Sequence, residues 1–265
     1  MKKALITGAS RGLGRALASG LAAAGYALVI DARDPRALHL AADAIRADAR
    51  RAGHAGANVT ALAGDITDPA HRAVLCAAGE IDLLVNNAGT LGAAPLPALA
   101  DYPVEQLRAA FEANVIAPIA LTQLFLPVLR ERGGAILNVT SDAAVEPYAG
   151  WGGYGAAKAA IEQASNVLAA EETAVRVWWV DPGDLRTDMH RAAFPGEDIS
   201  DRPLPESVVP ALVRLVTERL PSGRYRAAEL VPASERRDAA ASGLTSDDRG
   251  NPLHSGASER AGDAA

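Results

Sequence analysis

Short apolar segments alternate with longer amphipathic segments along most of the chain. The apolar segments have the length and composition of buried strands, and alanine and leucine recur between them at the spacing of helices. Strands are predicted at 3–7, 27–31, 59–63, 81–86, 135–139, 175–181 and 224–231, and helices at 15–24, 36–51, 69–78, 103–131, 155–172 and 206–219. This alternation predicts an α/β fold in which a parallel sheet of about seven strands carries helices on both faces.

The same pattern predicts one domain over residues 1–231. A length of 265 residues could suggest two domains, but α/β chains of this size are commonly one. Hydrophobic residues make up 49% of the chain and aromatic residues 4%, so the core is expected to be mainly aliphatic. From 232 to 265 the chain is polar and lacks periodicity, which predicts a disordered tail without chemistry of its own.

Charge and cysteine content narrow the class of protein. The net charge of −6 offers no general attraction to nucleic acid, and no apolar run approaches the length of a membrane span. Cys76 is the one cysteine, which fits a reducing compartment, and Met1 to Lys3 lead into the first strand without room for a secretory leader. We therefore expect a cytoplasmic protein with no nucleic-acid or membrane partner. The five histidines are scattered without metal-ligand spacing, so no metal site is predicted.

Tyr154 is followed four residues later by Lys158, and Ser141 lies thirteen residues before the tyrosine. In a helix, residues four apart share a face, so phenol and ammonium would point at a common target. A nearby cation lowers the pKa of a phenol because it favours the phenolate. Tyr154 is therefore a candidate proton donor and acceptor, although a Tyr-x-x-x-Lys pair alone is often ordinary helix surface.

A glycine-rich segment joins the first predicted strand to the first predicted helix. Gly8, Gly12 and Gly14 let the backbone turn tightly and let a diphosphate approach where a side chain would block it. Free amides and the positive end of the helix dipole would face the same point. The segment predicts a phosphate site, and the alternative is a glycine-rich turn without a ligand.

Six motifs together carry a resemblance to a known family. In chain order they are Thr7-Gly8-Ala-Ser-Arg-Gly12-Leu-Gly14, Asn86-Asn87-Ala88-Gly89, Asn114, Ser141, Tyr154-x-x-x-Lys158 and Pro182-Gly183-x-x-x-Thr187. In order and spacing they resemble the short-chain dehydrogenase/reductase family, in its short single-domain branch, over about residues 3–231. The resemblance implies a Rossmann-type, doubly wound sheet and an NAD(P)-dependent oxidoreductase that transfers hydride between the nicotinamide and a carbonyl or alcohol substrate.

The resemblance also implies a catalytic set. Tyr154 would exchange a proton with the substrate oxygen, and Lys158 would lower the pKa of the tyrosine and hold the nicotinamide ribose. Ser141 would hydrogen-bond the substrate oxygen and stabilise charge as it develops. Asn114 would hold a water molecule of a proton relay, and the alternative is a polar residue at a helix bend near Pro118.

By the same resemblance, several segments would contact the cofactor. Residues 87–89 would pack beside the adenine ribose, or they form a plain turn. Asp65 would contact the adenine amino group with Ile66 beside the ring, or cap a helix, although Asp68 is the better candidate for that cap. The full predicted set is Gly8, Ser10, Arg11, Gly12, Leu13, Gly14, Arg33, Asp65, Ile66, Asn87, Ala88, Gly89, Tyr154, Lys158, Pro182, Gly183, Leu185 and Thr187.

The choice between NADP and NAD rests on the end of the second predicted strand. Relatives that prefer NAD carry an acid there, but that position falls on Ala32 in this chain, and Arg33 follows it. A basic residue at this point, aided by Arg11, suits the 2′-phosphate of NADP. Asp31 and Asp34 leave NAD open, since a shift of one residue would put an acid in place. NADP is the predicted cofactor.

The segment after the sixth predicted strand would bind the nicotinamide carboxamide through the Leu185 backbone and the Thr187 hydroxyl. It departs from the family pattern at two points. The strand carries Trp178-Trp179, which must pack in the layer between sheet and helices or at a subunit contact. Asp181 and Asp184 flank Pro-Gly and could favour a cationic or hydroxylated substrate, or cap the following turn.

Substrate identity is not fixed by the sequence. The wall of the site is expected from residues 90–101, 142–153 and 188–205, which mix apolar and polar side chains, and the last segment could act as a lid. In the family, helices corresponding to 103–131 and 155–172 pair between subunits, so a homodimer or homotetramer is expected. The alternative to an enzyme is a catalytically silent, redox-sensing NAD(P)-binding protein of the same fold.

Overall fold

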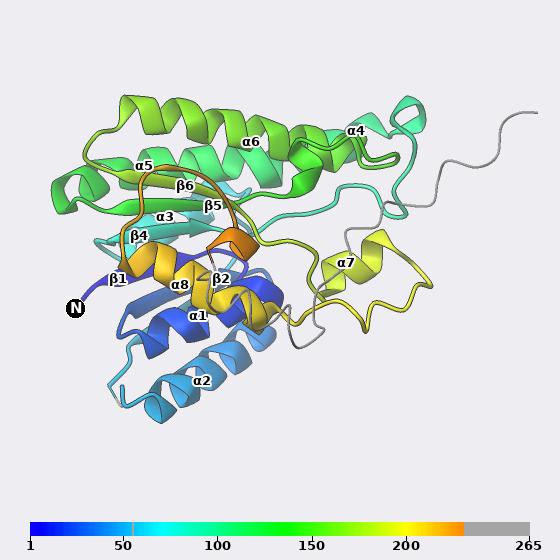
Figure 1. Cartoon of the computed structure of the whole chain (residues 1–265). Coiled ribbons are helices and arrows are strands. Elements are labelled where there is room, and N and C mark those ends of the chain that lie inside the picture. The colour runs from blue at the N-terminus through cyan, green and yellow to red at the C-terminus, as the bar shows by residue number, and fades with distance from the viewer. Residues whose placement is uncertain (55, 231–265) are drawn as a thin grey trace, which may run out of the picture. The chain divides into compact units, whose positions relative to one another are not determined.

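Seven parallel strands form one sheet in the computed structural model, which describes residues 1–54 and 56–230 (Figure 1). The strand order is β3-β2-β1-β4-β5-β6-β7. The strands are β1 (Lys3–Ile6), β2 (Ala27–Ala32), β3 (Val59–Ala63), β4 (Leu83–Asn86), β5 (Ala135–Val139), β6 (Arg176–Asp181) and β7 (Gly223–Arg226). Because the winding reverses after β3, the adjacent strands β1 and β4 form a switch point, which is where ligands of doubly wound sheets bind. The predicted Rossmann-type α/β fold is confirmed.

Helices cover both faces of this sheet. On one face α1 contacts α2 and α8, and on the other face α3 contacts α5 while α4 contacts α6 (Figure 1). The helices are α1 (Gly12–Ala23), α2 (Pro35–Arg51), α3 (Pro69–Ala77), α4 (Val104–Phe111), α5 (Ala117–Arg132), α6 (Gly152–Glu171), α7 (Asp188–Ala193) and α8 (Val209–Thr217). A π-helical segment, Glu112–Ile116, joins α4 to α5 without a break. Short 3-10 turns lie at Leu99–Asp101, Asp142–Ala144, Pro205–Val208 and Ala227–Glu229.

Two helices on opposite faces begin with the same local signal. The Asp34 carboxylate accepts hydrogen bonds from the backbone amides of the first turn of α2, and the Asp68 carboxylate accepts one from Ala70 N of α3. Proline follows each aspartate, where its missing N–H leaves no hydrogen bond unmade. Asp68 was the predicted cap and is confirmed. Asp34 was a possible acceptor for the ribose hydroxyls of NAD, but its carboxylate already accepts hydrogen bonds from the first turn of α2.

The core between the sheet and the α3–α5 layer is aliphatic with one aromatic anchor, Phe125. Trp178 of β6 is fully buried, and its indole Nε1 donates to the carbonyls of Leu220 and Pro221 at 2.9 and 3.1 Å. This satisfies the polar atom of a side chain that otherwise packs as a large apolar group. The expected place of Trp178 inside the protein is therefore confirmed.

The last strand is shorter than predicted. β7 ends at Arg226, opposite Asp181, and the chain then forms the 3-10 turn Ala227–Glu229. Pro182 follows Asp181 on the neighbouring strand and has no N–H for a further ladder bond, so β7 has no partner to continue. The prediction of a strand over 224–231 was wrong at its carboxyl end. Residue 231 and the predicted disordered tail at 232–265 lie outside the described residues.

The helical stretch Val104–Arg132 corrects a second prediction. By length and composition it would be able to cross a membrane, so the statement that no apolar run approaches that length was wrong. Leu121, Phe125 and Leu129 from this stretch are buried against the sheet. Core helices in soluble proteins pass the same test, and this burial accounts for the apolar composition.

Candidate active site

The glycine loop lies at the carboxyl end of β1, where the switch point opens. Gly8 and Gly12 have positive φ angles of 67° and 56°, a left-handed conformation that favours glycine. A Cβ added to Gly14 would lie 2.4 Å from Asn87 Nδ2 and 2.5 Å from the Gly8 carbonyl oxygen. Gly14 is therefore required by a close approach between the loop and the end of β4.

The amino end of α1 has the features of an anion site. Its cap residue, Arg11, supplies no side-chain hydrogen bond to the helix, and no acidic residue lies in the first turn. A Cβ on Gly12 would meet only Thr187 Cγ2, at 3.6 Å, so the space above the loop is open toward that threonine. Unpaired amides, a positive dipole end and an open cradle fit the diphosphate of a dinucleotide.

Hydrogen bonds fix the end of β4 to the glycine loop. The Thr7 hydroxyl accepts from the amides of Asn87 and Ala88, each at 3.0 Å, and Asn87 Nδ2 donates to the carbonyls of Thr7 and Gly8 at 2.9 and 3.2 Å. The predicted segment 87–89 thus does lie beside the loop. In this arrangement the Asn87 side chain acts as a brace for the loop.

At the end of β2, both candidate acids for the ribose are occupied. The buried Asp31 carboxylate accepts from Gly8 N at 3.3 Å and contacts His71 Nε2 at 2.7 Å. Burial raises the pKa of Asp31, and the hydrogen bond from His71 opposes that rise. Asp34 caps α2, and Arg33 before it is exposed.

Arg33 lies close enough to Asp65 to influence it. Burial pushes the pKa of Asp65 upward, but hydrogen bonds from Thr67 and the charges of Arg33 and His71 outweigh it, so the pKa is lowered. Ile66, beside Asp65, is buried. The predicted adenine-site residues Arg33, Asp65 and Ile66 are thus brought together at one corner of the sheet. Arg11, predicted to assist Arg33, instead pairs with Asp188 at 3.1 Å.

The candidate catalytic residues meet where β5 faces the start of α6. Tyr154 and Lys158 are 7% and 5% exposed, and the Lys158 Nζ lies 5.4 Å from the centre of the Tyr154 ring. Lys158 Nζ also donates to the Val139 carbonyl at 2.8 Å. A Cβ on Gly155 would lie 2.5 Å from the Ala143 carbonyl, so this glycine lets α6 approach the turn that follows Ser141.

Burial controls the acidity of this pair. It raises the pKa of Tyr154, with the charges of Asp142 and Asp181 adding to the effect and a hydrogen bond with Ser141 opposing it. Burial likewise lowers the pKa of Lys158 to about 8, opposed by the charge of Glu162. The expectation that Tyr154 has a lowered pKa is not met in this arrangement, because burial of the phenol and the charges of two nearby carboxylates raise it.

Ser141 lies two residues after β5 and caps the 3-10 turn that follows. Its hydroxyl accepts from Ala143 N at 3.2 Å and donates to Asp142 Oδ1 at 2.9 Å, and the other carboxylate oxygen of Asp142 accepts from the Tyr148 hydroxyl at 2.9 Å. Ser141, Asp142 and Tyr148 therefore form a polar edge next to Tyr154. This edge belongs to the predicted wall segment 142–153.

Asn114 lies in the π-helical segment and connects it to the loop after β4. Its Oδ1 accepts from Thr90 N at 3.0 Å, and its Nδ2 donates to the Thr90 carbonyl at 2.8 Å. Pro118, four residues later, has no N–H for the Asn114 carbonyl, which removes the usual α-helical bond and accounts for the π segment. The predicted bend near Pro118 and the predicted site position of Asn114 therefore coincide.

The segment after β6 completes the rim. The Thr187 hydroxyl accepts from His190 N at 3.2 Å and caps α7, a helix that was not predicted. Gly183 N donates to the buried Asp181 carboxylate at 2.9 Å, so Asp181 does stabilise the turn at Pro182-Gly183. Leu185 is buried beside this turn, and the Arg11–Asp188 pair joins the glycine loop to α7.

Sequence reasoning missed three partners in this region: Thr90, His71 and Arg224. Arg224 of β7 donates to both carboxylate oxygens of Glu162 and to the Ser141 carbonyl. Each missed residue acts on a group 24 to 83 positions away in sequence. No local pattern connects residues so far apart, since their contact depends on strand order.

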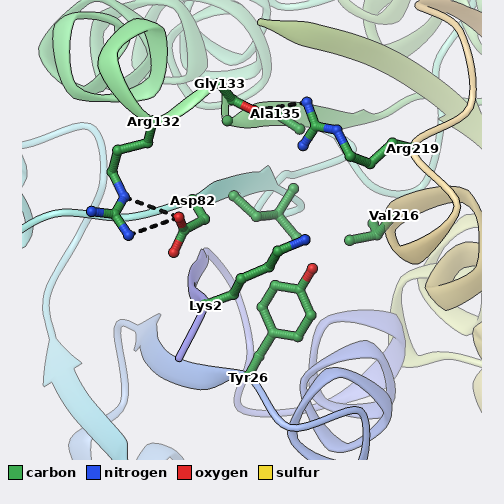
Figure 2. A pocket seen from close by; sticks show the side chains of 10 residues that line it. Lys2, Tyr26, Asp82, Arg132, Gly133, Ala135, Val216 and Arg219 are labelled. Atoms are coloured by element: carbon green, nitrogen blue, oxygen red, sulfur yellow. Dashed lines mark hydrogen bonds and ion pairs between the residues drawn. The ribbon is translucent and has the colours of Figure 1, made fainter.

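A small enclosed pocket of about 40 Å³ lies at the opposite end of the sheet, near the starts of β4 and β5 (Figure 2). There Arg132 contacts the Asp82 carboxylate at 2.9 Å and Arg219 donates to the Gly133 carbonyl at 2.7 Å (Figure 2). Its position at the amino ends of the strands separates it from the candidate site. Among the residues that the structure describes, no group of three or more His, Cys, Asp or Glu could hold a metal ion.

Comparison with known proteins gives consistent relatives. The sequence profile of the family described as short chain dehydrogenase matches residues 2–198. A sepiapterin reductase of Meriones unguiculatus is 36% identical over 204 residues, which cover 71% of this chain and 76% of that protein. A 1-deoxy-11-beta-hydroxypentalenate dehydrogenase of Streptomyces exfoliatus is 36% identical over 197 residues, covering 71% of this chain and 69% of that protein.

Solved structures agree with the sequence relatives. A short-chain dehydrogenase from Shigella flexneri 2a in complex with NADP is 27% identical, with a TM-score of 0.78 and coverage of 86% of this chain and 97% of that one. An alcohol dehydrogenase from Thermococcus sibiricus in complex with 5-hydroxy-NADP is 27% identical, with a TM-score of 0.74 and coverage of 85% and 95%.

Proposed function

Because the chain belongs to the short-chain dehydrogenase family, we propose that it is an NADP-dependent oxidoreductase that acts on a small carbonyl or alcohol compound. The observation that carries the proposal is the meeting of Ser141, Tyr154 and Lys158 at the carboxyl end of the sheet, beside the glycine loop. Relatives named as a reductase and as a dehydrogenase both occur, so the proposal covers either direction of the reaction.

The proposed cofactor is NADP, which supplies or accepts the hydride. The open cradle at Gly12 and the amino end of α1 suit its diphosphate. Arg33 is proposed to pair with the 2′-phosphate, because Asp31 and Asp34 are engaged by His71 and by α2. The exposed Arg11–Asp188 pair contributes little stability, so Arg11 is able to leave it for a phosphate. The NADP complexes of similar structures support this choice.

Tyr154 is the proposed acid and base. In the reducing direction its hydroxyl donates a proton to the carbonyl oxygen as the carbon receives hydride, and in the oxidising direction the phenolate takes the proton back. A phenol with a raised pKa stays protonated near neutral pH, which suits the donor role. The Ser141 hydroxyl, which donates to Asp142 Oδ1 in this structure, is proposed to turn and donate a hydrogen bond to the same oxygen.

Lys158 is proposed to supply positive charge at the moment when Tyr154 becomes a phenolate. An ammonium close to the phenol ring favours the phenolate without being a proton donor to the substrate. The same ammonium is proposed to hold the nicotinamide ribose, and Leu185 and Thr187 the carboxamide. Asn114 holds the Thr90 backbone, and we propose that its carbonyl, which lacks a bond from Pro118, holds a relay water.

Three further expectations concern the assembly, the location and the domain organisation of the protein. The exposed apolar side chains of Val104, Ile116 and Leu124 on α4–α5 and Val167 on α6 support a homo-oligomer through these helices, because an isolated chain would leave them in water. The cytoplasmic location and the one-domain organisation predicted from the sequence remain predictions.

A Tyr154→Phe variant tests the chemistry. We expect NADPH-dependent reduction of carbonyl compounds to fall by at least about 1,000-fold, because the proton donor is lost, while NADPH binding changes little. Tyr26→Phe is the matched control, since Tyr26 is buried to the same degree and lies at the opposite end of the sheet. Normal turnover in Tyr154→Phe would refute the mechanism. Cofactor binding by the wild type without turnover on any carbonyl or alcohol would favour the silent, redox-sensing alternative.

Fluorescence titration with NADPH and NADH tests the cofactor. We expect tighter NADPH binding, and a loss of about 10- to 100-fold in NADPH affinity with unchanged NADH affinity in Arg33→Ala, because a charged hydrogen bond to phosphate is removed. Arg36→Ala is the control, as an exposed arginine at the nearby start of α2. A clear NADH preference in the wild type would reverse the cofactor assignment, and binding of neither would contradict the enzyme proposal.

A further inference from the structure

A buried charged pair lies directly behind the candidate reaction centre. Glu162 of α6 is 9% exposed, and its carboxylate accepts from Arg224 Nε at 3.0 and 3.1 Å. The Thr140 hydroxyl donates to the same carboxylate at 2.8 Å. Glutamate is rarely this buried unless it is paired, so the position of Glu162 is specified by both partners.

Glu162 shares a helix face with the catalytic residues. Tyr154, Lys158 and Glu162 are spaced by four residues on α6, and each faces the end of β5. Lys158 bonds the Val139 carbonyl, and Glu162 bonds the hydroxyl of the next residue, Thr140. Ser141 follows, and a hydrogen bond links it to Tyr154. Three residues of one helix face therefore each contact one of the three consecutive residues 139–141.

Arg224 connects this face to the opposite side of the centre. Besides Glu162, its guanidinium lies 3.4 Å from the Ser141 carbonyl oxygen and 3.9 Å from Asp181 Oδ2. Asp181 stabilises the turn at Pro182-Gly183 through Gly183 N. One side chain from β7 thus touches the backbone of the catalytic serine, the carboxylate behind the lysine and the base of the carboxamide segment.

We propose that Glu162 is a positioning residue for the reaction centre: Thr140 and Arg224 hold its carboxylate, which keeps Lys158 charged, and Arg224 also fixes the backbone of Ser141. The inference rests on the proposed function for its catalytic meaning. The effect of Glu162 on the Lys158 pKa involves only residues of this chain, so it can be measured without cofactor or substrate.

Among the groups around Lys158, Glu162 is the anion that affects its pKa. On its own helix Lys158 lies one turn from Glu162 and over the phenol ring of Tyr154, and its Nζ donates to the Val139 carbonyl of β5. A Cβ on Gly89 would lie 3.8 Å from the same Nζ. Glu162 is the one charged group among the causes that shift the pKa of Lys158, and it acts against burial. Around Glu162 the charged groups are Arg224 and, beyond it, Asp181, which also lies 4.0 Å from Arg226.

The test is a titration of the lysine side chains by NMR in ¹³C-lysine-labelled protein without cofactor. The chain has three lysines, Lys2, Lys3 and Lys158, so the Cε signals are few, and Lys158→Arg assigns the third. We expect the Lys158 pKa, about 8 in the wild type, to fall by about 0.5 to 1 pH unit in Glu162→Gln, because the neutral amide can still accept from Thr140 but no longer attracts the ammonium.

Glu172→Gln is the matched control. Glu172 is an equally buried glutamate at the end of the same helix and pairs with Arg130, away from the centre. We expect its loss to leave the Lys158 pKa unchanged. An unchanged pKa in Glu162→Gln, or an equal fall in both variants, would overturn the proposal in favour of a purely structural ion pair.

A double variant guards against misfolding. Glu162→Met with Arg224→Met removes both members of the buried pair together, a replacement that proteins often tolerate better than the loss of one partner. The Lys158 pKa is expected to fall here too, and no change would contradict the proposal. Failure of the proposed function has a different signature: the wild type would bind neither NADPH nor NADH while the Lys158 pKa still responded to Glu162→Gln.

Discussion

Among the three glycines of the glycine loop, Gly14 has the least room for a side chain. The position of its missing Cβ lies within 2.5 Å of the Gly8 carbonyl oxygen and of Asn87 Nδ2. One neighbour is backbone and the other is held by the carbonyls of Thr7 and Gly8, so neither can move without breaking the brace between loop and strand. Packing and ligand binding therefore place the same demand on this position.

Gly14→Ala is expected to lower the free energy of unfolding by about 1 to 3 kcal/mol, the usual range for overpacking, and to weaken NADPH binding. Urea unfolding and cofactor titration measure the two effects. Gly56→Ala is the control, since no atom lies within 4 Å of the corresponding Cβ position. Equal stability of the two variants would show that the brace is softer than its geometry indicates.

At this scale, the sequence located residues whose role is local. Asp68 before Pro69 accepts from an amide two positions away, and the positive φ angles of Gly8 and Gly12 are a demand of the local turn, so residue type and spacing suffice. The roles of Asp31 and Asn87 could not be predicted. Asp31 contacts His71, 40 positions away, and Asn87 contacts Gly8, 79 positions away, and only the strand order brings these pairs together.

At the scale of elements, β6 determines how β7 joins the sheet. Trp178 donates its indole N–H to the carbonyls of Leu220 and Pro221, just before β7 begins at Gly223. At the other end, Pro182 ends the ladder opposite Arg226. β7 is therefore held at its start by a side chain and stopped at its end by a missing donor, and it carries Arg224 between these points.

Trp178→Phe is expected to lower the free energy of unfolding by about 1 to 3 kcal/mol, because it removes buried area and leaves two carbonyls without their donor. Hydrogen exchange should quicken selectively at the amides of β7 (Gly223–Arg226). Trp179→Phe is the matched control, since within the described residues the Trp179 indole has no such bond. A uniform quickening over the whole sheet would contradict a specific brace.

The sequence predicted all seven strands, the last with a wrong carboxyl end, and the alternation of elements, because apolar periodicity is a local signal. It did not predict the π segment in the 103–131 helix or the helix α7. The π segment depends on the missing N–H of Pro118 together with the bond from Asn114 to Thr90 in another element. The helix α7 has six residues, too few for a helical period to appear. Both lie at the rim of the site, where tertiary contacts override local preference.

At the scale of the whole molecule, the burial of Lys158 lowers the stability of the fold, although the proposed chemistry requires this lysine. An ammonium that is 5% exposed loses most of its hydration on folding, which is why its pKa falls from 10.5 to about 8. The unfolded chain then binds a proton between these two values while the folded chain does not. Above pH 10.5 the lysine is neutral in both states and does not lower the free energy of unfolding. As the pH falls from 10.5 to about 8 the unfolded chain gains a proton that the folded chain does not, so the free energy of unfolding decreases over this range.

Comparison of wild type with Lys158→Met over this range isolates the effect, since all other titrating groups are shared. Because each pH unit between the two pKa values corresponds to about 1.4 kcal/mol, the free energy of unfolding of the wild type should rise by about 3 kcal/mol relative to the variant from pH 8 to 10.5. Denaturant unfolding at several pH values measures it, with the exposed Lys2→Met as a control that should follow the wild type. Parallel curves for wild type and Lys158→Met would mean that the lysine is hydrated in solution. A rising difference would mean that the fold retains a destabilising cation at the point where the proposed chemistry needs it.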